Sequence, residues 1–268
     1  MTYARLMEHA EDIRREAVEA TLVLLDGPET SVRKSVEREF ADVPDAFRPL
    51  TGFPDPARYD GLADGVDDVL RGLSTGDGMP ADPEVARFNG TVAALRSWSG
   101  TAAERFRAGF ADPWPALVRN QFTACAVLRS ALRAEQDIWA RARQDADQIA
   151  EQGLAAIMAC RDCTRTEWTI TFTVVASVAA VAAVPVGGAI ALAAGGVAGV
   201  AQVAAATGPD EAPRSTFSGD DPAEIVSRLR EAIGLLRGHI RQQRAGVGAA
   251  LRTTRMLMTD RPELFGWS

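Results

Sequence analysis

Apolar residues recur every three or four positions along most of this chain, which is the spacing of one face of an amphipathic helix. A strand-like pattern is confined to residues 169–175. The pattern predicts an all-α fold. It consists of a long helical hairpin or bundle with a Trp-x-Gly turn, an apolar Ala/Gly-rich helical hairpin and a long C-terminal helix.

Breaks in this pattern divide the chain into seven segments. They are N-terminal helices at 1–42, a proline-rich linker or ordered crossover at 43–53, a helical hairpin domain at 54–163, an apolar Ala/Gly-rich helical hairpin at 164–209, a loop at 210–220, an amphipathic helix at 221–259 and a tail at 260–268.

One turn organises the predicted central hairpin. The helix before it begins at Asp82-Pro83, a favourable N-cap followed by proline at the first helical position, and its apolar face ends at Trp98. Gly100 suits the position after a helix, where a left-handed residue is often required. Thr101 and Glu104 have the spacing of a capping box, so we expect a second helix to begin there.

The residues around this turn resemble a known family. Trp98-Ser99-Gly100, followed by Ala102, Ala103 and Phe106, is similar to the WXG family of type VII (ESX) secretion substrates of actinobacteria and firmicutes, over about residues 54–160. The resemblance implies a helical hairpin that pairs with a WXG-like partner, the secretion machinery or another copy of itself. It also implies a substrate or effector of an actinobacterium, cytoplasmic before export and then secreted or held in the cell envelope. The alternative is that Trp98 is a core residue at an ordinary helix corner.

The export signal common in the family is an aromatic residue followed four positions later by Asp or Glu, and this chain departs from that pattern. Neither Tyr3 nor Tyr59 has an acidic residue at that spacing. Trp139 occupies a suitable place after the turn, but Arg143 stands four residues on. Three possibilities follow: a partner carries the signal, the chain uses a variant signal, or it is not exported.

Residues 168–209 carry no charged side chain, and Ala and Val dominate them. A transmembrane helix needs about 20 apolar residues, so the stretch has room for two, turning near Pro185. Leu, Ile and Phe are scarce, which places membrane insertion near its threshold. Small residues recur at the four-residue spacing of closely packed helices. They are Ala179, Ala183, Gly187, Ala191, Gly195 and Gly199.

Three interpretations of this stretch remain open. It is a hairpin buried in a helical bundle, a hairpin that inserts into a membrane later, or a permanent membrane anchor. We favour burial because the flanking amphipathic helices would cover it. The second interpretation makes the protein a membrane-inserting, pore-forming or translocation protein driven by residues 168–206, which is our alternative function.

Composition and charge narrow the choice of partner. The net charge is −7, so we expect no nucleic-acid binding, which requires a clustered basic face. Residues 1–25 contain charged residues throughout and no apolar core of a signal peptide. The arginine-rich helix at 221–259 is expected to have a solvated face rather than to lie on a membrane. A protein partner, with a membrane as a further candidate, therefore fits best.

The chain offers no convincing set of catalytic residues. Cys160 and Cys163 form a C-x-x-C pair at a helix end, where we expect idle thiols or a disulfide formed after export. The pairs Asp67-Asp68 and Asp145/Asp147 are interpreted as solvated helix faces. We therefore expect no enzyme activity, cofactor or metal, and place the interaction residues at Trp98, Gly100, Phe106 and Trp139.

Overall fold

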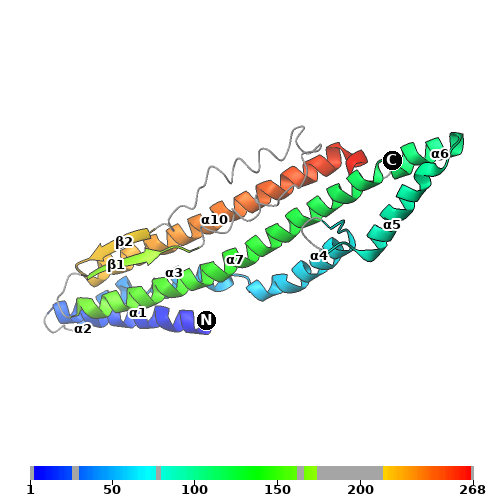
Figure 1. Ribbon diagram of the computed structural model, residues 1–268. Helices are drawn as coiled ribbons and strands as arrows, with labels where there is room; N and C mark the ends of the chain where they lie inside the picture. The colour runs from blue at the N-terminus through cyan, green and yellow to red at the C-terminus, as the bar shows by residue number, and fades with distance from the viewer. Residues whose placement is uncertain (1–2, 26–29, 77–79, 162–165, 174–213, 267–268) are drawn as a thin grey trace. The chain divides into compact units, whose positions relative to one another are not determined.

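The structure is a computed structural model that describes residues 3–25, 30–76, 80–161, 166–173 and 214–266. Helices make up 82% of the interpretable residues, so the predicted helical class is confirmed. A two-stranded antiparallel sheet corrects the all-α prediction (Figure 1). The predicted C-terminal helix is α10 (Pro222–Asp260) and the other long helix is α7 (Trp114–Cys160).

The chain forms two compact units, and α7 and α10 contribute to both. The first unit contains described residues 3–56, 137–173 and 214–244, and the second contains 57–136 and 245–266. The first has α1 (Tyr3–Leu24), α2 (Thr30–Glu39), α3 (Val43–Phe47), the 3₁₀ turn η1 (Arg48–Gly52), β1 (Thr166–Thr171) and β2 (Arg214–Gly219). The elements of the second unit are η2 (Pro56–Tyr59), α4 (Asp60–Gly72), α5 (Pro83–Ala94), η3 (Leu95–Ser97), α6 (Thr101–Phe106), the π-helical turn η4 (Arg107–Ala111) and η7 (Pro262–Leu264). The first residue of η2, Pro56, belongs to the first unit.

The core of the first unit consists of large aliphatic and aromatic side chains. Ile13 of α1, Phe47 of α3 and Leu50 of η1 are each at most 1% exposed, as is Ile149 of α7. Burial of side chains of this size contributes about 1.5–3 kcal/mol each. Surface ion pairs add to this packing, including Arg161–Glu16 at 2.9 Å.

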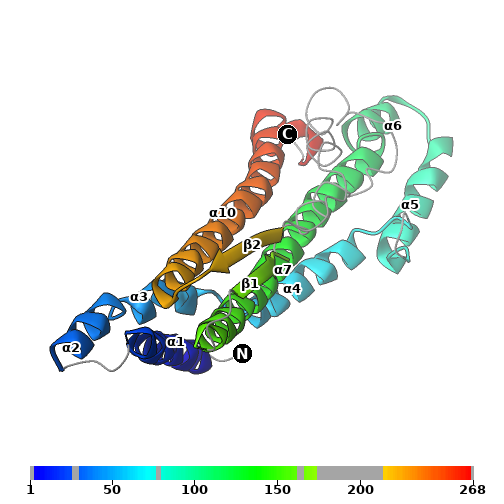
Figure 2. The same cartoon turned by 90° about the vertical axis from the view of Figure 1, so that its left-hand side faces the viewer.

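The sheet pairs residues on either side of the uncharged stretch. β1 and β2 place Trp168 opposite Phe217, whose rings stack at a centroid distance of 4.6 Å. Thr169 and Thr216 are also opposite, with hydroxyl oxygens 3.3 Å apart. An isolated two-stranded ribbon is marginally stable in water. Figures 1 and 2 both show the strands beside α10, and Trp168 and Phe217 are buried.

The core of the second unit is made of smaller groups. Among the largest fully buried side chains of the described chain, only Leu70 of α4 belongs to this unit. Its other buried positions are mostly alanine or valine, for example Ala131 and Ala134 of α7. Large apolar side chains remain at its surface, including Leu62 (60% exposed) and Leu128 (41% exposed). This unit therefore keeps much of its apolar surface in contact with solvent.

Two predicted helix starts are confirmed by capping hydrogen bonds. Asp82 Oδ1 accepts the N–H groups of Glu84 and Val85 at 2.9 and 3.1 Å at the start of α5. Asp221 Oδ1 accepts the N–H of Glu224 at 2.7 Å at the start of α10. Such caps contribute about 1 kcal/mol each, which explains why the two helices begin where the sequence predicts.

Three segments have a secondary structure that differs from the one the sequence pattern predicts. Of the two alternatives for 43–53, the structure shows an ordered segment and not a plain linker: it is α3 followed by η1, because Val43, Phe47 and Leu50 are apolar and buried. Residues 214–219 of the expected loop at 210–220 form β2. Residues 166–171, at the start of the expected apolar helical hairpin, form β1, since Thr, Trp and Ile favour extended backbone. The remainder of that hairpin lies outside the described residues.

A pair of glycine substitutions tests the packing of α7 on α10 in the first unit. A Cβ on Gly153 would lie 2.3 Å from Leu229 Cδ2 and 3.0 Å from Cγ, and Leu229 is itself buried. We expect Gly153→Ala to lower the free energy of unfolding by about 1–3 kcal/mol in urea titrations, because the core is overpacked.

The control is Gly234→Ala on α10, where an added Cβ meets no atom within 4 Å. It should raise the free energy of unfolding by up to about 1 kcal/mol through helix propensity. Equal stability of the two variants would contradict the close approach of Gly153 to Leu229.

Candidate functional site

The Trp98–Gly100 turn lies between η3 and α6 in the second unit. Trp98 is extended, and its N–H donates to Leu95 O at 3.0 Å. Gly100 has a φ of +101°, a value that residues with a side chain rarely adopt, so the expected requirement for glycine is confirmed. Its carbonyl accepts the N–H of Glu104 at 3.0 Å, which makes Gly100 the N-cap of α6. Thr101 does not cap α6 because it is already the first helical residue.

A continuous row of aromatic side chains extends from this turn to the start of α7. Centroid distances are 6.0 Å for Trp98–Phe106, 5.3 Å for Phe106–Phe110, 5.7 Å for Phe110–Phe88 and 4.5 Å for Phe88–Trp114. Edge-to-face and tilted contacts at these distances are favourable beyond the area that they bury. We call these five residues, Trp98, Phe106, Phe110, Phe88 and Trp114, the aromatic row.

None of the aromatic row is buried. Trp98 is 43% exposed, and the other four side chains are partly exposed. Aromatic residues of this size normally dominate a core, and they are also enriched where protein surfaces meet. The row is therefore an ordered apolar surface.

Trp114 is one of three row members, with Phe88 and Phe110, that the sequence analysis did not place at the interaction site. Its indole N–H donates to Asn89 Oδ1 of α5 at 2.9 Å, which fixes its ring beside Phe88. The available signal was its position four residues after Phe110, across Asp112-Pro113, where proline favours a kink or a restart of the helix. The structure shows a restart there, since η4 ends at Ala111 and α7 begins at Trp114.

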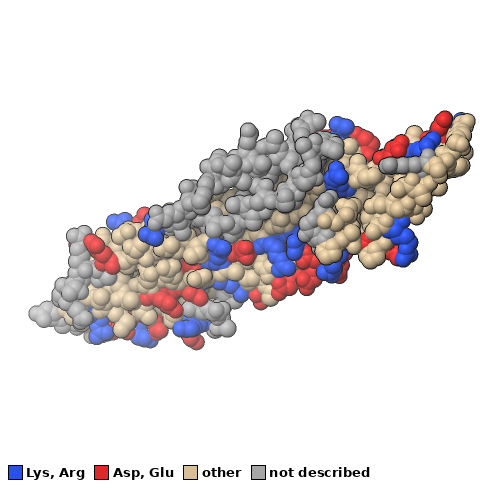
Figure 3. All heavy atoms as spheres, in the orientation of Figure 1, with Lys and Arg blue, Asp and Glu red and all other residues tan. Residues whose placement is uncertain are grey.

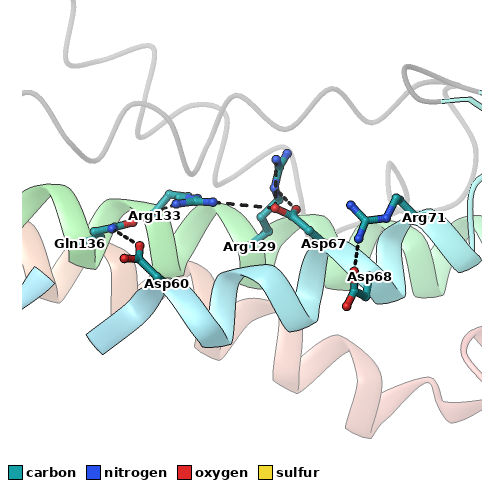
Figure 4. Close-up of polar contacts among 7 residues, drawn as sticks. All are labelled: Asp60, Asp67, Asp68, Arg71, Arg129, Arg133 and Gln136. Carbon is teal, nitrogen blue, oxygen red and sulfur yellow. Dashed lines mark hydrogen bonds and ion pairs between the residues drawn. The ribbon is translucent and has the colours of Figure 1, made fainter. Parts of the chain in front are cut away.

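A ladder of polar contacts joins α4 to α7 in the second unit (Figure 4). Asp67, with a side chain 18% exposed, pairs with Arg129 and, at 3.8 Å, with Arg133. Gln136, one turn after Arg133 on α7, donates to Asp60 Oδ1 of α4 at 2.6 Å. Asp67 is therefore a partly buried contact between helices, which corrects its interpretation as part of a solvated face. Asp68 does lie on the surface and pairs with Arg71 of its own helix.

The tail beyond α10 is held by two amide side chains of α7. Asn120 Nδ2 donates to Leu264 O at 2.8 Å, and Gln121 Nε2 donates to Phe265 O at 2.7 Å. Asn120 is only 7% exposed. These bonds bind backbone carbonyl groups, so no pattern in the tail sequence predicted them.

Trp139, the fourth predicted interaction residue, belongs to the first unit and is buried, with 7% of its surface exposed. Its ring lies 5.6 Å from that of Phe53, and the Arg244 guanidinium carbon lies 5.2 Å from the ring centroid. Such a cation–π contact is worth about 0.5–2 kcal/mol. The structure thus brings Trp98, Gly100 and Phe106 together and places Trp139 in a different unit, in a core position.

A buried carboxylate anchors the end of β1 in the first unit. Asp145 is fully buried, and its two oxygens accept the N–H of Thr173 at 3.0 and 3.1 Å and its hydroxyl at 2.8 Å. Arg141, one turn earlier on α7, donates to Thr173 O at 3.0 Å. Asp145 was expected on a solvated helix face. Its burial shows that tertiary contacts decide its role.

His239 of α10 lies beside this anchor. Its ring is 5.1 Å from that of Phe172, and its Nδ1 is buried without a hydrogen-bond partner. Burial lowers the pKa of His239 from its ordinary value, and the negative charge of Asp145 offsets part of that effect. The imidazole is therefore preferentially neutral in the folded protein.

The small-residue face and the cysteines are the remaining positions that the sequence analysis singled out. The small-residue face, Ala179, Ala183, Gly187, Ala191, Gly195 and Gly199, lies outside the described residues, as does Cys163. Cys160 is buried, with Sγ 3.7 Å from Asp220 O. Cys125 is half-buried, which raises the pKa of its thiol. Within the described ranges, no three His, Cys, Asp or Glu side chains gather as metal ligands would.

No family model, curated protein or solved structure matches this chain. In the part of the chain that the structure describes, no helix combines the length and apolar character needed to cross a membrane.

We expect Asp67→Asn to lower the free energy of unfolding by about 0.5–1 kcal/mol, because two arginines of α7 lose a charged partner that is largely shielded from water. The effect should shrink at high salt, which screens partly exposed charges. Asp68→Asn is the matched control. Its pair is exposed at both ends, so unfolding titrations should detect almost no change. Equal losses in the two variants would contradict the ladder.

The lowered pKa of His239 predicts a loss of stability in acid. The unfolded state binds a proton near the ordinary value of 6.5, before the folded state does. The free energy of unfolding should therefore fall as pH drops below 6.5 and level off below the folded-state pKa. Thermal unfolding between pH 8 and 5 should show a steeper loss for the wild type than for His239→Gln, which cannot titrate. Parallel curves would contradict this assignment.

Proposed function

We propose that this protein is a WXG-type substrate or effector of a type VII secretion system that acts by associating with a helical protein partner. The aromatic row is the contact surface, and the Trp98–Gly100 turn fixes one end of it. The resemblance at Trp98-Ser99-Gly100 supports the export route, which takes the protein from the cytoplasm to the cell envelope or medium.

The observation that carries this proposal is an ordered aromatic row that is left partly exposed. Trp98 contacts Phe106 and retains 43% of its surface in solvent. Residues that contribute most to binding at protein interfaces are enriched in Trp and are held in place before binding. An aromatic residue fixed by its neighbours gives up little conformational freedom when a partner covers it.

The thin core of the second unit supports the same conclusion. Leu62 and Val69 of α4 are 60% and 49% exposed, and Leu128 of α7 is 41% exposed. Large apolar side chains left exposed on a protein surface are candidates for contact with a partner. A helical partner that covered these side chains would bury apolar surface that the described part of the second unit leaves exposed.

The charge distribution favours apolar association over binding to a polyanion. Figure 3 shows acidic and basic residues intermingled on the face that it presents. The net charge of −7 would repel nucleic acid. The partner surface is therefore expected to be apolar and helical, as in a WXG-type hairpin pair.

We expect Trp98→Ala to reduce partner binding and export at least tenfold while far-UV circular dichroism shows nearly unchanged helix content. Removal of a half-exposed ring takes contact area from an interface and little from the core. The matched control is Met158→Ala, which shortens a 51%-exposed apolar side chain of the first unit and should change neither quantity. Loss of helix content in Trp98→Ala would instead make Trp98 a core residue at a helix corner.

The export route is tested by fractionating the native host into cytosol, membrane and culture filtrate, with and without its type VII ATPase. A filtrate signal that disappears without the ATPase is the expected result. A signal that stays in the membrane fraction in both strains would contradict export and favour a membrane-inserting protein.

A further inference from the structure

A single non-helical residue joins α10 to the last described part of the chain. Directly after α10, Arg261 has a φ of −134° and a ψ of 60°, so the chain leaves the helical conformation there. The next residues close into the turn η7, in which the N–H groups of Phe265 and Gly266 donate to Pro262 O at 3.0 Å. We call residues 262–266 the docked tail, a compact turn at the end of α10.

Two neighbouring carboxamides of α7 hold the docked tail by its backbone. Asn120 Nδ2 donates to Leu264 O at 2.8 Å. Gln121 Nε2 donates to Phe265 O at 2.7 Å. The side chains of Leu264 and Phe265 are half-buried, and Asn120 is buried. Asn120 and Gln121, which we call the carboxamide pair, therefore form a small binding site for a peptide backbone with apolar side chains.

One member of the carboxamide pair lies on the side of α7 where the aromatic row ends. Residues at i, i+4, i+7, i+11 and i+14 share one side of a helix. Counted from Trp114, the later positions are Val118, Gln121, Cys125 and Leu128, and we call all five the α7 stripe. Trp114 and Val118 also line the same pocket, as this placement requires. Gln121 is thus the polar position of an otherwise apolar stripe.

Apolar side chains of the α7 stripe reach solvent before and after Gln121. Trp114 is partly exposed, Cys125 is half-buried and Leu128 is 41% exposed. The stripe is about 20 Å long, from a rise of about 1.5 Å per residue. A partner helix that extended its contact from the aromatic row along this stripe would meet the docked tail at Gln121. The tail therefore occupies surface that such a partner needs.

We propose that the docked tail is a displaceable cover of the α7 stripe and so regulates the surface that the helical partner uses. In the free protein the tail occupies the carboxamide pair and interrupts the stripe. Two hydrogen bonds and two half-buried side chains make a small contact, which a helix covering the whole stripe exceeds. Segments that open in this way come from the weakly held parts of a protein. The inference rests on the proposed association with a helical partner.

The first test asks whether a free peptide can take the place of the tail. Leu264→Ser/Phe265→Ser in the full-length protein removes the apolar side chains of the docked tail and leaves the carboxamide pair intact. A peptide with the sequence of residues 261–268, carrying 4-fluorophenylalanine in place of Phe265, is followed by ¹⁹F NMR. It should bind this tail variant with a dissociation constant of about 1 mM or below. It should bind the wild type at least about threefold more weakly, because the tethered tail competes at an effective concentration in the millimolar range.

Three further substitutions, each added to the tail variant, locate the peptide on α7. Asn120→Ala/Gln121→Ala removes both donors, and Gln121→Glu replaces the partly exposed donor by a carboxylate, which cannot donate to a carbonyl oxygen. Both should abolish binding of the peptide. Gln242→Ala removes an exposed carboxamide of α10 in the first unit and should leave binding unchanged. Circular dichroism identifies any variant that fails to fold. Binding that persists in a folded variant of the pair, no binding to the tail variant, or equal binding to the tail variant and the wild type would overturn the proposal.

The second test measures whether the tail covers the α7 stripe. Cys125 lies four residues after Gln121 on this stripe, so the reactivity of its thiol depends on the surface next to the tail. Labelling by iodoacetamide, measured at Cys125 by mass spectrometry, should be at least threefold faster in Leu264→Ser/Phe265→Ser than in the wild type. An excess of the peptide should reverse this gain. Equal labelling rates, or a gain that the peptide does not reverse, would overturn the proposal. Neither test involves a partner, so a failure here leaves the export test of Trp98→Ala unaffected.

Discussion

The helix α7 has 47 residues, and other elements must bury its apolar face along that length. The side chains that it buries differ between the two units. In the first unit it buries three isoleucines, Ile138, Ile149 and Ile157. In the second unit it buries Leu117 and Val118 near its start and then two alanines, Ala131 and Ala134. Since apolar stabilisation scales with the area removed from water, the second unit gains less from its own packing.

The weaker core of the second unit explains why its surface holds the candidate sites. In the described part of the second unit, the aromatic residues remain partly exposed to solvent and are ordered by contacts with one another. Trp98 and Trp114 are fixed in this way, one by Phe106 and the other by Phe88 and Asn89. Surfaces that are rigid and apolar before binding lose little entropy when a partner or ligand covers them.

The first unit uses buried polar groups for a different purpose. Asp145 and Arg141 both bind Thr173, so the chain is held at the point where β1 ends. A buried carboxylate is tolerated only when its oxygens accept hydrogen bonds, and this one accepts from both the N–H and the hydroxyl of Thr173. The neighbouring His239 remains neutral because charging it in this environment is unfavourable. These contacts specify a position in the fold that apolar packing alone would leave loose.

Local chemistry in the sequence determined where the main helices begin and where the chain breaks between them. Asp82 and Asp221 start helices because their side chains bind N–H groups two and three residues away, and Gly100 marks the break because its φ excludes most other residues. The helical class follows from the same short-range periodicity. Only the tertiary structure decided that residues 166–171 and 214–219 pair as strands, that Asp145 and Trp139 are buried, and that Trp114 completes the aromatic row. Each of these depends on contacts between residues far apart in the chain, and a pattern that spans a few positions contains no information about such partners.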